Sequence, residues 1–411
     1  MTRILFVGDM AATGFGTVTR ELGLGLLGRG YDVRFVCMNE QSEGLGEPFV
    51  GRTAILGNFT GWLGMEDPGE TAKKLEGMFT GSLFEDGWKP DAAIILGDPA
   101  SLKMSPVLDF IPEGFPAFHY CPIEGVGLPP SWVHLWERAM PVAVAESGAH
   151  ELARLVGHPV PYIYHGVDVE TYHPATAAHP IVLTKPDGEM AVLRDKAACR
   201  KFLGWPADDV ILFRHDRHVP RKQYPALFRI AAAVIAQDPR VRLMIHCRTL
   251  DEGGDLSDEH SKYLSRIADR MRSTGYADQR LTVSPKFLSV MLNASDIYVS
   301  TCAEGFGLCI AEALACGIPA IGLDYSSVPE VIGPAGVTVP FHLIDNIYSY
   351  FWARPDEEAY ISALLALIKA PERFVMGAKG PGHVREHFTW DKAAEGFAAL
   401  IDAAVPQEVA A

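Results

Sequence analysis

Two glutamates, Glu304 and Glu312, stand eight positions apart in the segment STCAEGFGLCIAEALACGIPAIG. Between them Gly305 and Gly307 flank Phe306, and glycines at such positions let a backbone approach a bound ligand closely. Two glutamates at this spacing mean little alone in a long acidic chain, so the glycines around them supply the information. The pair is therefore a candidate for holding the two ends of one elongated ligand.

A short helix is expected directly behind this glycine loop, from Leu308 to Cys316, with Gly317 and Pro319 ending it. Such a helix start presents free N–H groups and a positive dipole end, which favour a phosphate or a sugar hydroxyl. With Glu304 in the loop and Glu312 two turns along, the two lie roughly 12 Å apart at ~1.5 Å rise per residue. A glycosidase acid and nucleophile must come within about 5–10 Å, so the spacing argues against that pairing.

Two cations, Arg217 and Lys222, flank the expected turn between the strand VILF and the next helix. Open α/β folds place their ligands at this edge of the sheet. Arginine can hold a diphosphate bidentately and lysine adds a compact charge, although the same spacing in isolation more often marks a solvated basic turn. Arg214 and His215 are either further ligand contacts or strand-end surface.

A second glycine pair, Gly14 and Gly16, is expected in a loop between the first strand, RILFVGD, and its helix. A dinucleotide fingerprint is incomplete there because Thr19 occupies the third glycine position. The loop either cradles a phosphate or an acceptor with its backbone or only satisfies the turn geometry. Asp9 and Asp98 stand at expected strand ends and are acceptor-side candidates.

Short β-branched and aromatic runs alternate with helical stretches along the chain, which is the pattern of parallel βαβ units covered on both faces. Asp168 to about Arg200 is irregular and is interpreted as the connection between two such series. A terminal helix is expected in HFTWDKAAEGFAALIDAAV. The sequence therefore predicts an α/β fold with two doubly wound parallel sheets.

The composition of the chain argues against several classes of function. A formal charge of −15 over 411 residues disfavours a surface that tracks nucleic acid. Seven cysteines without CxxC spacing indicate buried thiols in a reducing compartment, so the cytoplasm is expected. Neither a signal peptide nor a stretch long enough to span a bilayer is recognised. The chain contains no DxD, the carboxylate pattern expected where Mg²⁺ or Mn²⁺ bridges a diphosphate.

The order of motifs resembles the family 4 glycosyltransferases, retaining enzymes of the GT-B fold. The resemblance rests on co-linear segments spread over most of the chain: GFG at Gly14 to Gly16, AVAESGAHELARL, YHGVDVETYHP, DRHVPRK and EGFGLCIAE, with weaker similarity in KPDAAIILGD and FTWDKAAEGF. One departure is Gln223, which follows the lysine where the family most often has glycine. The resemblance implies an acceptor-side lobe (1–172), a donor-binding lobe (173–385) and a terminal helix (386–411) that returns to the first lobe, with the active site in the cleft between lobes.

The resemblance also assigns roles to individual residues. Glu312 is expected to accept hydrogen bonds from the ribose of the donor, and Glu304 to lie beside the transferred sugar. His119 matches a family histidine that contacts the sugar through a ring nitrogen, although a lone strand-end histidine is more often structural. The remaining expected donor contacts are the diphosphate cations Arg217 and Lys222, the backbone at Gly16, and the N–H groups of Phe306, Gly307 and Leu308.

The implied reaction moves a hexose from a nucleoside diphosphate sugar to an acceptor hydroxyl with retention and without a metal or other cofactor. UDP is the default donor nucleotide, and the acceptor is open among a glycan, a lipid, a small molecule and a protein. Two alternatives on the same scaffold are a nucleotide-sugar epimerase or hydrolase and a non-catalytic nucleotide-sugar-binding protein. Acceptor choice is assigned to the stretch from about Glu40 to Trp88, and the donor base to the loop from Val283 to Phe287.

Overall fold

The computed structural model describes residues 1–11, 13–38, 46–56, 68–100, 104–185, 187–256, 270–273, 283–346 and 348–405. These residues form two compact units. Unit 1 comprises Met1–Gly166, Ile347–Tyr350 and Trp390–Ala411, and unit 2 comprises Val167–Asn346 and Phe351–Thr389. The first long stretch of unit 1 therefore ends at Gly166, whereas the sequence suggested residue 172 for the end of the first lobe. Parts of the stretch from Glu40 to Trp88 lie outside the described residues.

Unit 1 is built on a parallel six-stranded sheet with the order β3-β2-β1-β4-β5-β6. The strands are β1 (Arg3–Gly8), β2 (Asp32–Cys37), β3 (Thr53–Ile55), β4 (Ala92–Leu96), β5 (Ala117–Cys121) and β6 (Met140–Ala143). Every residue of β4 and β5 is buried, as expected for central strands covered on both faces. This is the order of a doubly wound fold, with its switch point between β1 and β4.

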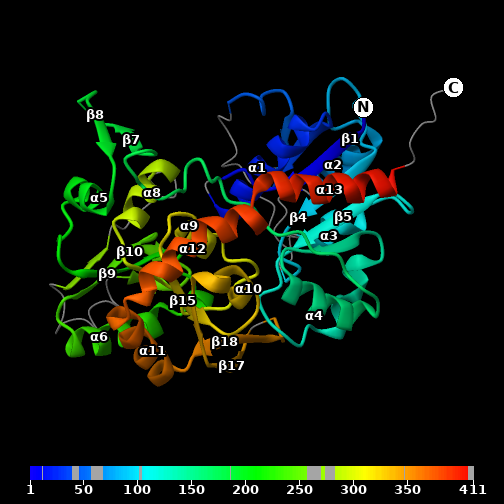
Figure 1. Ribbon diagram of the computed structural model, residues 1–411. Helices are drawn as coiled ribbons and strands as arrows, with labels where there is room; N and C mark the ends of the chain where they lie inside the picture. The colour runs from blue at the N-terminus through cyan, green and yellow to red at the C-terminus, as the bar shows by residue number, and fades with distance from the viewer. Residues whose placement is uncertain are drawn as a thin grey trace. The chain divides into compact units, whose positions relative to one another are not determined.

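The helices of unit 1 are α1 (Gly14–Gly28), α2 (Pro68–Thr80), α3 (Met104–Asp109), η3 (Pro130–Trp136), α4 (Glu146–Val156) and the terminal α13 (Trp390–Ala404). Helix α13 packs against α1, which joins the two ends of the chain within this unit (Figure 1). A Cβ atom added at Gly25 would come 2.7 Å from the Cβ of Ala394, so this glycine permits the close approach of the two helices.

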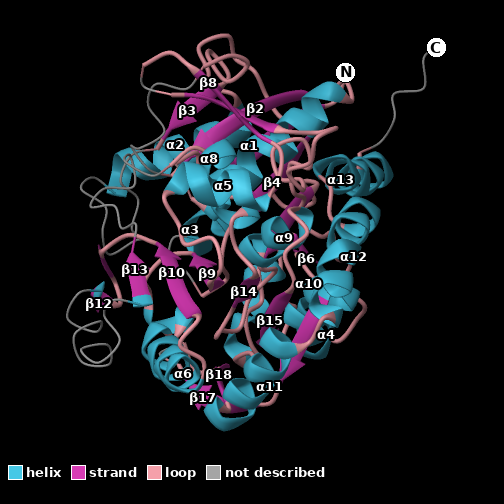
Figure 2. Cartoon of the chain, turned by 60° about the vertical axis from the view of Figure 1, so that its left-hand side comes forward, coloured by secondary structure: helices cyan, strands magenta, loops and turns pink. Residues whose placement is uncertain are grey.

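Unit 2 contains a second parallel sheet, with the order β13-β10-β9-β14-β15-β16. Figure 2 labels the first five of these strands. Its strands are β9 (Val210–His215), β10 (Val241–His246), β13 (Met271–Ser273), β14 (Ile297–Val299), β15 (Ala320–Leu323) and β16 (Gly336–Val339). Strand order reverses between β9 and β14, so this sheet has the same kind of switch point as the first. The predicted fold class, two doubly wound parallel sheets, is confirmed.

The helices of unit 2 are α5 (Lys196–Leu203), η4 (Pro220–Lys222), α6 (Tyr224–Gln237), α8 (Pro285–Asn293), α9 (Leu308–Ala315), α10 (Val328–Ile332), η7 (Gly333–Ala335), α11 (Glu357–Lys369) and α12 (Glu372–His387). Helix α12 packs on α9, and α6 packs on α11 (Figure 1). A Cβ atom at Gly380 would lie 2.4 Å from the carbonyl oxygen of Leu314, and one at Gly377 2.4 Å from that of Gly317. These two glycines therefore let α12 fix the position of α9.

The described residues of unit 2 also form three antiparallel pairs: β7 (Ile181–Thr184) with β8 (Met190–Leu193), β11 (Leu250–Asp251) with β12 (Gly254–Asp255), and β17 (Phe341–Asp345) with β18 (Phe351–Pro355). The prediction of an irregular connection from Asp168 to Arg200 was therefore wrong in part, because the stretch contains the hairpin β7-β8 and the start of α5. Its alternation is too short to stand out from the turn residues around it. None of the described helices is both long and apolar enough to cross a lipid bilayer.

Candidate active site

In unit 2, charged side chains gather where the chain leaves β9 and β14, the two strands that flank the switch point. Lys222, in η4, forms an ion pair with Glu304, and the two side chains are 9% and 10% exposed. Arg221 adds a second cation, with its Nη1 3.2 Å from Oε2 of Glu304 and 2.8 Å from the carbonyl oxygen of Ala303. Glu304 is thus held between two cations at the carboxyl edge of the sheet.

A buried arginine organises the backbone beneath this pair. Arg214 is fully buried and donates to the carbonyl oxygen of Lys222 at 2.7 Å and to Oγ1 of Thr301 at 2.5 Å. It also binds the carboxylate of Asp216 at 2.9 Å, and Tyr224 donates to the same carboxylate at 2.6 Å. Arg214 is therefore a structural residue that ties the loop after β9 to the loop after β14, and it is not strand-end surface.

The charges of the cluster stabilise one another. Burial would raise the pKa of Glu304, but Lys222 and Arg221 lower it below its ordinary value. Burial would likewise raise the pKa of Asp216, and Arg214 and Lys222 lower it. For Lys222 the opposite holds, because burial would lower its pKa and Glu304 raises it. Both carboxylates and the ammonium group are therefore charged at neutral pH.

The glycine loop has the geometry expected for a ligand-binding helix start. Helix α9 begins at Leu308, as predicted, and its N-cap Gly307 has a left-handed backbone (φ +101°) and no side chain to cap the first turn. The hydroxyl group of Ser327 fixes the loop, since it donates to the carbonyl oxygens of Glu304 and Phe306, each at 2.8 Å. The amides in the first turn of α9 therefore have no side-chain cap. The hydrogen bonds from Ser327 hold the backbone of the preceding loop in place.

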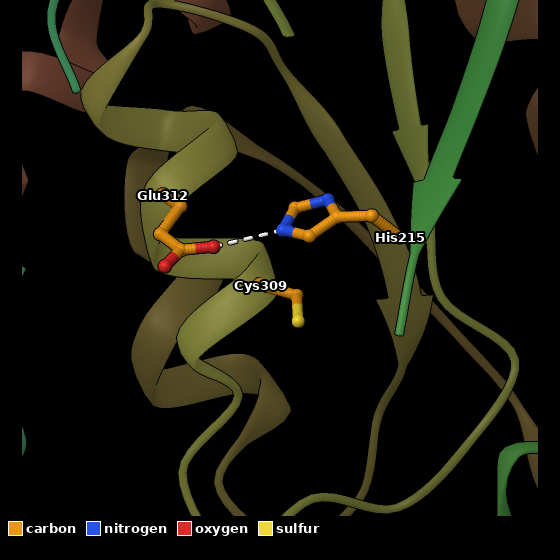
Figure 3. A group of neighbouring side chains, drawn as sticks. All are labelled: His215, Cys309 and Glu312. Carbon is orange, nitrogen blue, oxygen red and sulfur yellow. Dashed lines mark hydrogen bonds and ion pairs between the residues drawn. The ribbon is translucent and has the colours of Figure 1, made fainter. Parts of the chain in front are cut away.

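Glu312 lies further along α9 and has a different partner. Figure 3 shows His215, at the end of β9, pointing toward Glu312 and Cys309 of this helix. The Nε2 atom of His215 is 2.8 Å from Oε2 of Glu312. Burial would lower the pKa of His215, but Cys309 and Glu312 raise it to about 10. Glu304 and Glu312 therefore belong to separate polar groups, as their expected separation requires.

Arg217 lies apart from the buried cluster in its contacts. Its guanidinium binds Asp251 at 2.7 Å and Glu252 at 2.9 Å, and its side chain is 43% exposed. A role on a diphosphate, as the resemblance implies, requires this arginine to share or leave these two carboxylates. The described contacts of Arg217 and Lys222 thus do not form one clamp, and their joint role stays a prediction.

The acceptor-side candidates of unit 1 flank the switch point of its own sheet. Asp9 follows β1, and its carboxylate accepts hydrogen bonds from the amide of Ala11 at 2.8 Å and from Oγ1 of Thr13 at 3.1 Å. Asp98 follows β4 and accepts from the amide of Ala100 at 2.8 Å. Both are partly exposed, so each carboxylate shapes its loop while part of it faces solvent.

His119 is internally satisfied. It is the central residue of β5 and fully buried, whereas the sequence suggested a strand end. Its Nδ1 accepts from the indole N–H of Trp136 at 3.0 Å, which leaves Nε2 to donate to the carbonyl oxygen of Gly97 at 3.1 Å. Burial lowers the pKa of His119 to about 4, so the ring is neutral. Neither ring nitrogen is open to a sugar in this arrangement, which favours the structural alternative.

Gly16 also departs from its expectation. The predicted loop at Gly14 to Gly16 is wrong, because α1 begins at Gly14 and Thr13 caps it by accepting from the amide of Gly16 at 3.0 Å. A Cβ atom at Gly16 would lie 1.9 Å from the carbonyl oxygen of Ala11. The glycine is therefore required by the close approach of its own loop, and its amide is already engaged.

Sequence reasoning did not select several residues of the two polar groups of unit 2, namely Asp216, Arg221, Cys302, Ser326 and Ser327 in the group of Glu304 and Cys309 in the group of Glu312. Arg221 and Asp216 had a usable signal, since both lie in the same strand-to-helix turn as Lys222. Ser326 and Ser327 had no such signal in the sequence. They lie more than 20 positions after Glu304 and contact its loop only in the folded chain.

Residues 209–369, most of unit 2, match the family described as Glycosyl transferases group 1. The chain is 27% identical over 241 residues to a GDP-mannose-dependent monoacylated alpha-(1-6)-phosphatidylinositol monomannoside mannosyltransferase of Corynebacterium glutamicum, covering 55% of this chain and 51% of that protein. It is 30% identical over 240 residues to a D-inositol 3-phosphate glycosyltransferase of Segniliparus rotundus, covering 57% and 49%. The chain thus spans about half the length of the curated relatives it matches.

Two solved structures resemble the whole chain in fold. A glycosyltransferase from Rickettsia africae has a TM-score of 0.70 at 13% identity and covers 99% of both chains. Alr3699/HepE of Anabaena, in complex with UDP and glucose, has a TM-score of 0.65 at 15% identity, with 98% of this chain and 100% of that chain covered. Two doubly wound units of this kind define a GT-B protein. With the match of unit 2 to the Glycosyl transferases group 1, these findings support the resemblance to family 4 glycosyltransferases that the motifs indicated.

Proposed function

We propose that this protein transfers a hexose from a nucleoside diphosphate sugar to an acceptor hydroxyl, with the donor bound to unit 2. The observation that carries the proposal is the buried Lys222–Glu304 pair beside the amino end of α9. It places a cation, a carboxylate and uncapped amides together at the switch point of a doubly wound sheet, where such folds bind nucleotides.

Lys222, Glu304 and the start of α9 suit the two sides of the bond that breaks, between the sugar and the diphosphate. Negative charge grows on the diphosphate as the bond to the sugar breaks, and Lys222 and the dipole of α9 would stabilise that charge. Lys222 binds Oε1 of Glu304 and Arg221 binds Oε2, so Glu304 would accept hydrogen bonds from sugar hydroxyls with the remaining lone pairs of these two oxygens. Glu312, on the next turns of α9, would bind the ribose.

We further propose a reaction with retention at the anomeric carbon. An oxygen of the leaving diphosphate would take the proton of the acceptor hydroxyl on the same face of the sugar, so no carboxylate attacks the sugar. The ion pairs of Glu304 support this assignment, because a carboxylate whose two oxygens are bound by Lys222 and Arg221 is a weak nucleophile. Arg217 would join the diphosphate by exchanging its contacts with Asp251 and Glu252.

For the donor we propose a GDP-hexose in place of the UDP-sugar that the sequence suggested by default. The Corynebacterium glutamicum relative is named as GDP-mannose-dependent, and it is 27% identical to this chain over 241 residues. The UDP complex of the Anabaena protein is similar at only 15% identity, which supports the fold alone. The acceptor is proposed only as a hydroxyl group, because the relatives extend well beyond the matched region.

The test of this proposal is a thermal-shift panel of GDP, UDP, ADP and their hexose conjugates, followed by product analysis. A ligand that prefers the folded state raises the unfolding midpoint by an amount linked to its affinity. We expect GDP and GDP-mannose to give the largest shifts, and α-linked product to form from an α-linked donor. Donor turnover without any acceptor would favour an epimerase or hydrolase, and binding without turnover would favour a non-catalytic protein.

A further inference from the structure

A second polar group on α9 has the composition of a metal site. His215, Cys309 and Glu312 each offer one ligand atom, and these nitrogen, sulfur and oxygen atoms all lie within 4.8 Å of one another. Figure 3 shows the three side chains converging from the end of β9 and one face of α9. Cys309 and Glu312 are three positions apart on the helix, so they share that face.

We propose that His215, Cys309 and Glu312 bind a thiophilic divalent cation such as Zn²⁺, with a fourth position open to solvent. Tetrahedral zinc with ligands at ~2.0–2.3 Å requires ligand atoms roughly 3–4 Å apart, so the cluster needs only small side-chain rotations to reach that geometry. Imidazole and thiolate ligands select zinc over Mg²⁺, which prefers oxygen. Cys309 and Glu312 are partly exposed, so an ion has a path from solvent.

A plain hydrogen bond between His215 and Glu312 accounts for less of what is observed. That bond does not include the sulfur of Cys309, which lies within 4.8 Å of the ligand atoms of both His215 and Glu312. The Nδ1 atom of His215 is buried with no hydrogen-bond partner among the described residues, whether or not an ion binds at Nε2. Ring packing holds the imidazole in place instead, stacked on Phe213 at 5.6 Å and edge-on to Tyr298 at 5.5 Å. A rigid imidazole opposite two helix residues is a preorganised chelating arrangement.

The lack of a hydrogen-bond partner at Nδ1 of His215 also indicates how tightly the site would hold an ion. Zinc-binding histidines usually donate their second ring N–H to a carboxylate or carbonyl, and removing such a partner costs about 10–100-fold in metal affinity. Three ligands without that support describe an exchangeable ion, not a permanent structural one. The site would thus respond to the concentration of free zinc.

A second cluster of the same composition serves as an internal comparison. Asp216, Cys302 and Glu304 also bring their ligand atoms within 4.8 Å of one another. In that cluster the cationic position is already filled by Lys222, which is 3.5 Å from Asp216 and ion-paired with Glu304. A metal ion there would have to displace a buried ammonium group, so we expect only the His215 cluster to bind metal.

Metal binding would regulate the protein if the proposed function holds. Glu312 is the proposed ribose ligand, and a carboxylate that coordinates zinc is lost to the ribose hydroxyls. Zinc and the donor nucleotide should therefore compete for Glu312. This consequence rests on the proposed function, whereas the metal site itself does not.

The test uses Co²⁺ as a spectroscopic substitute for zinc on the metal-free protein, with the whole 411-residue chain. We expect one equivalent to bind with a thiolate-to-cobalt charge-transfer band that added Zn²⁺ abolishes. Cys309→Ser should lose the band, and His215→Gln and Glu312→Gln should weaken cobalt binding on the order of 100-fold. Cys302→Ser is the matched control and should keep the band. Circular dichroism and unfolding midpoints establish that each variant is folded.

Absence of the band in the wild-type protein, or a band that survives Cys309→Ser, overturns the metal site. The link to donor binding is read separately, by titrating GDP with and without one equivalent of Zn²⁺. A fall in GDP affinity of tenfold or more supports competition at Glu312. An unchanged affinity beside an intact cobalt band overturns the regulatory consequence and leaves the metal site standing.

Discussion

Lys222 and Glu304 form a buried ion pair that joins the segments following β9 and β14, the two strands at the switch point of the unit 2 sheet. Each charge depends on the other, since burial alone would disfavour both charged forms. The pair therefore combines a structural role with the chemistry proposed for the donor diphosphate.

Removing the cation should be costly. Lys222→Met is expected to lower the free energy of unfolding by roughly 3 kcal/mol at pH 7, because it leaves Glu304 and Asp216 buried with fewer cations. Urea unfolding measures the loss. The double variant Lys222→Met/Glu304→Gln should recover part of it, since the uncompensated carboxylate is then gone.

The matched control for that variant is Lys185→Met, which breaks an exposed ion pair with Glu189. We expect a change below about 1 kcal/mol there, as for other exposed pairs. Equal losses for Lys222→Met and Lys185→Met would show that burial does not set the energy of the Lys222–Glu304 pair.

The backbone of Gly307 should tolerate no side chain. At φ +101° an alanine is strained, and its Cβ would lie 3.3 Å from Cδ1 of Ile310 and 3.5 Å from Cγ of Glu304. Gly307→Ala should destabilise the protein by about 1–2 kcal/mol and weaken nucleotide binding by distorting the start of α9. Gly28→Ala, in α1, meets nothing within 4 Å and serves as the neutral control. Equal unfolding midpoints for the two variants would contradict this account of the loop.

Buried neutral histidine should make unit 1 sensitive to acid. The pKa of His119 is about 4 when folded, against about 6.5 in the unfolded chain. Below pH 6.5 the unfolded chain takes up a proton that the folded protein does not. This contribution to stability is therefore complete above pH 6.5 and is lost as the pH falls to 4, up to roughly 3 kcal/mol.

The measurement is urea unfolding between pH 7.5 and 4.5, followed by tryptophan fluorescence, to which Trp136 beside His119 contributes. His119→Gln should flatten the pH dependence relative to wild type. His158→Gln replaces an exposed histidine and should leave the slope unchanged. A slope unaffected by His119→Gln would mean that this residue does not stay neutral in the folded protein.

The sequence predictions succeeded where neighbouring residues decide the structure, and they failed where residues far apart in the sequence interact. Local patterns were sufficient for α9, whose apolar spacing and terminal glycine match the observed helix, and for the alternation of strands and helices. The interior of the site was not predictable in this way. The contacts of Arg214 with Thr301 and of Ser327 with Glu304 connect residues far apart in sequence, and no local propensity records them.

His119 and Gly16 show the complementary error. Their residue types fitted a ligand site, but the folded chain already uses their polar groups. Trp136 donates a hydrogen bond to Nδ1 of His119, and Oγ1 of Thr13 accepts a hydrogen bond from the amide of Gly16. A motif identifies residues capable of binding, whereas only the tertiary structure reveals whether their hydrogen-bonding capacity is already taken.

Chelators should not abolish transfer. The proposed diphosphate site uses Lys222 and the amides of α9 in place of a metal, so activity should survive EDTA. If zinc occupies the His215 cluster of the purified protein, EDTA should raise activity, and Cys309→Ser should remove that increase. Loss of activity in EDTA that Mg²⁺ or Mn²⁺ restores would contradict the metal-independent mechanism.

Calorimetric titration of GDP and GDP-mannose, with UDP for comparison, tests the central assignment of donor binding to unit 2 most directly. It is carried out in EDTA on wild type, Glu312→Gln and Glu304→Gln, with transfer assayed in parallel. Glu312→Gln should weaken GDP and GDP-mannose by similar factors, corresponding to ~1.5–3 kcal/mol, because ribose is common to both. Glu304→Gln should leave GDP affinity nearly intact and depress transfer. No nucleotide binding to wild type, or a loss of GDP affinity in Glu304→Gln as large as in Glu312→Gln, would contradict the assignment.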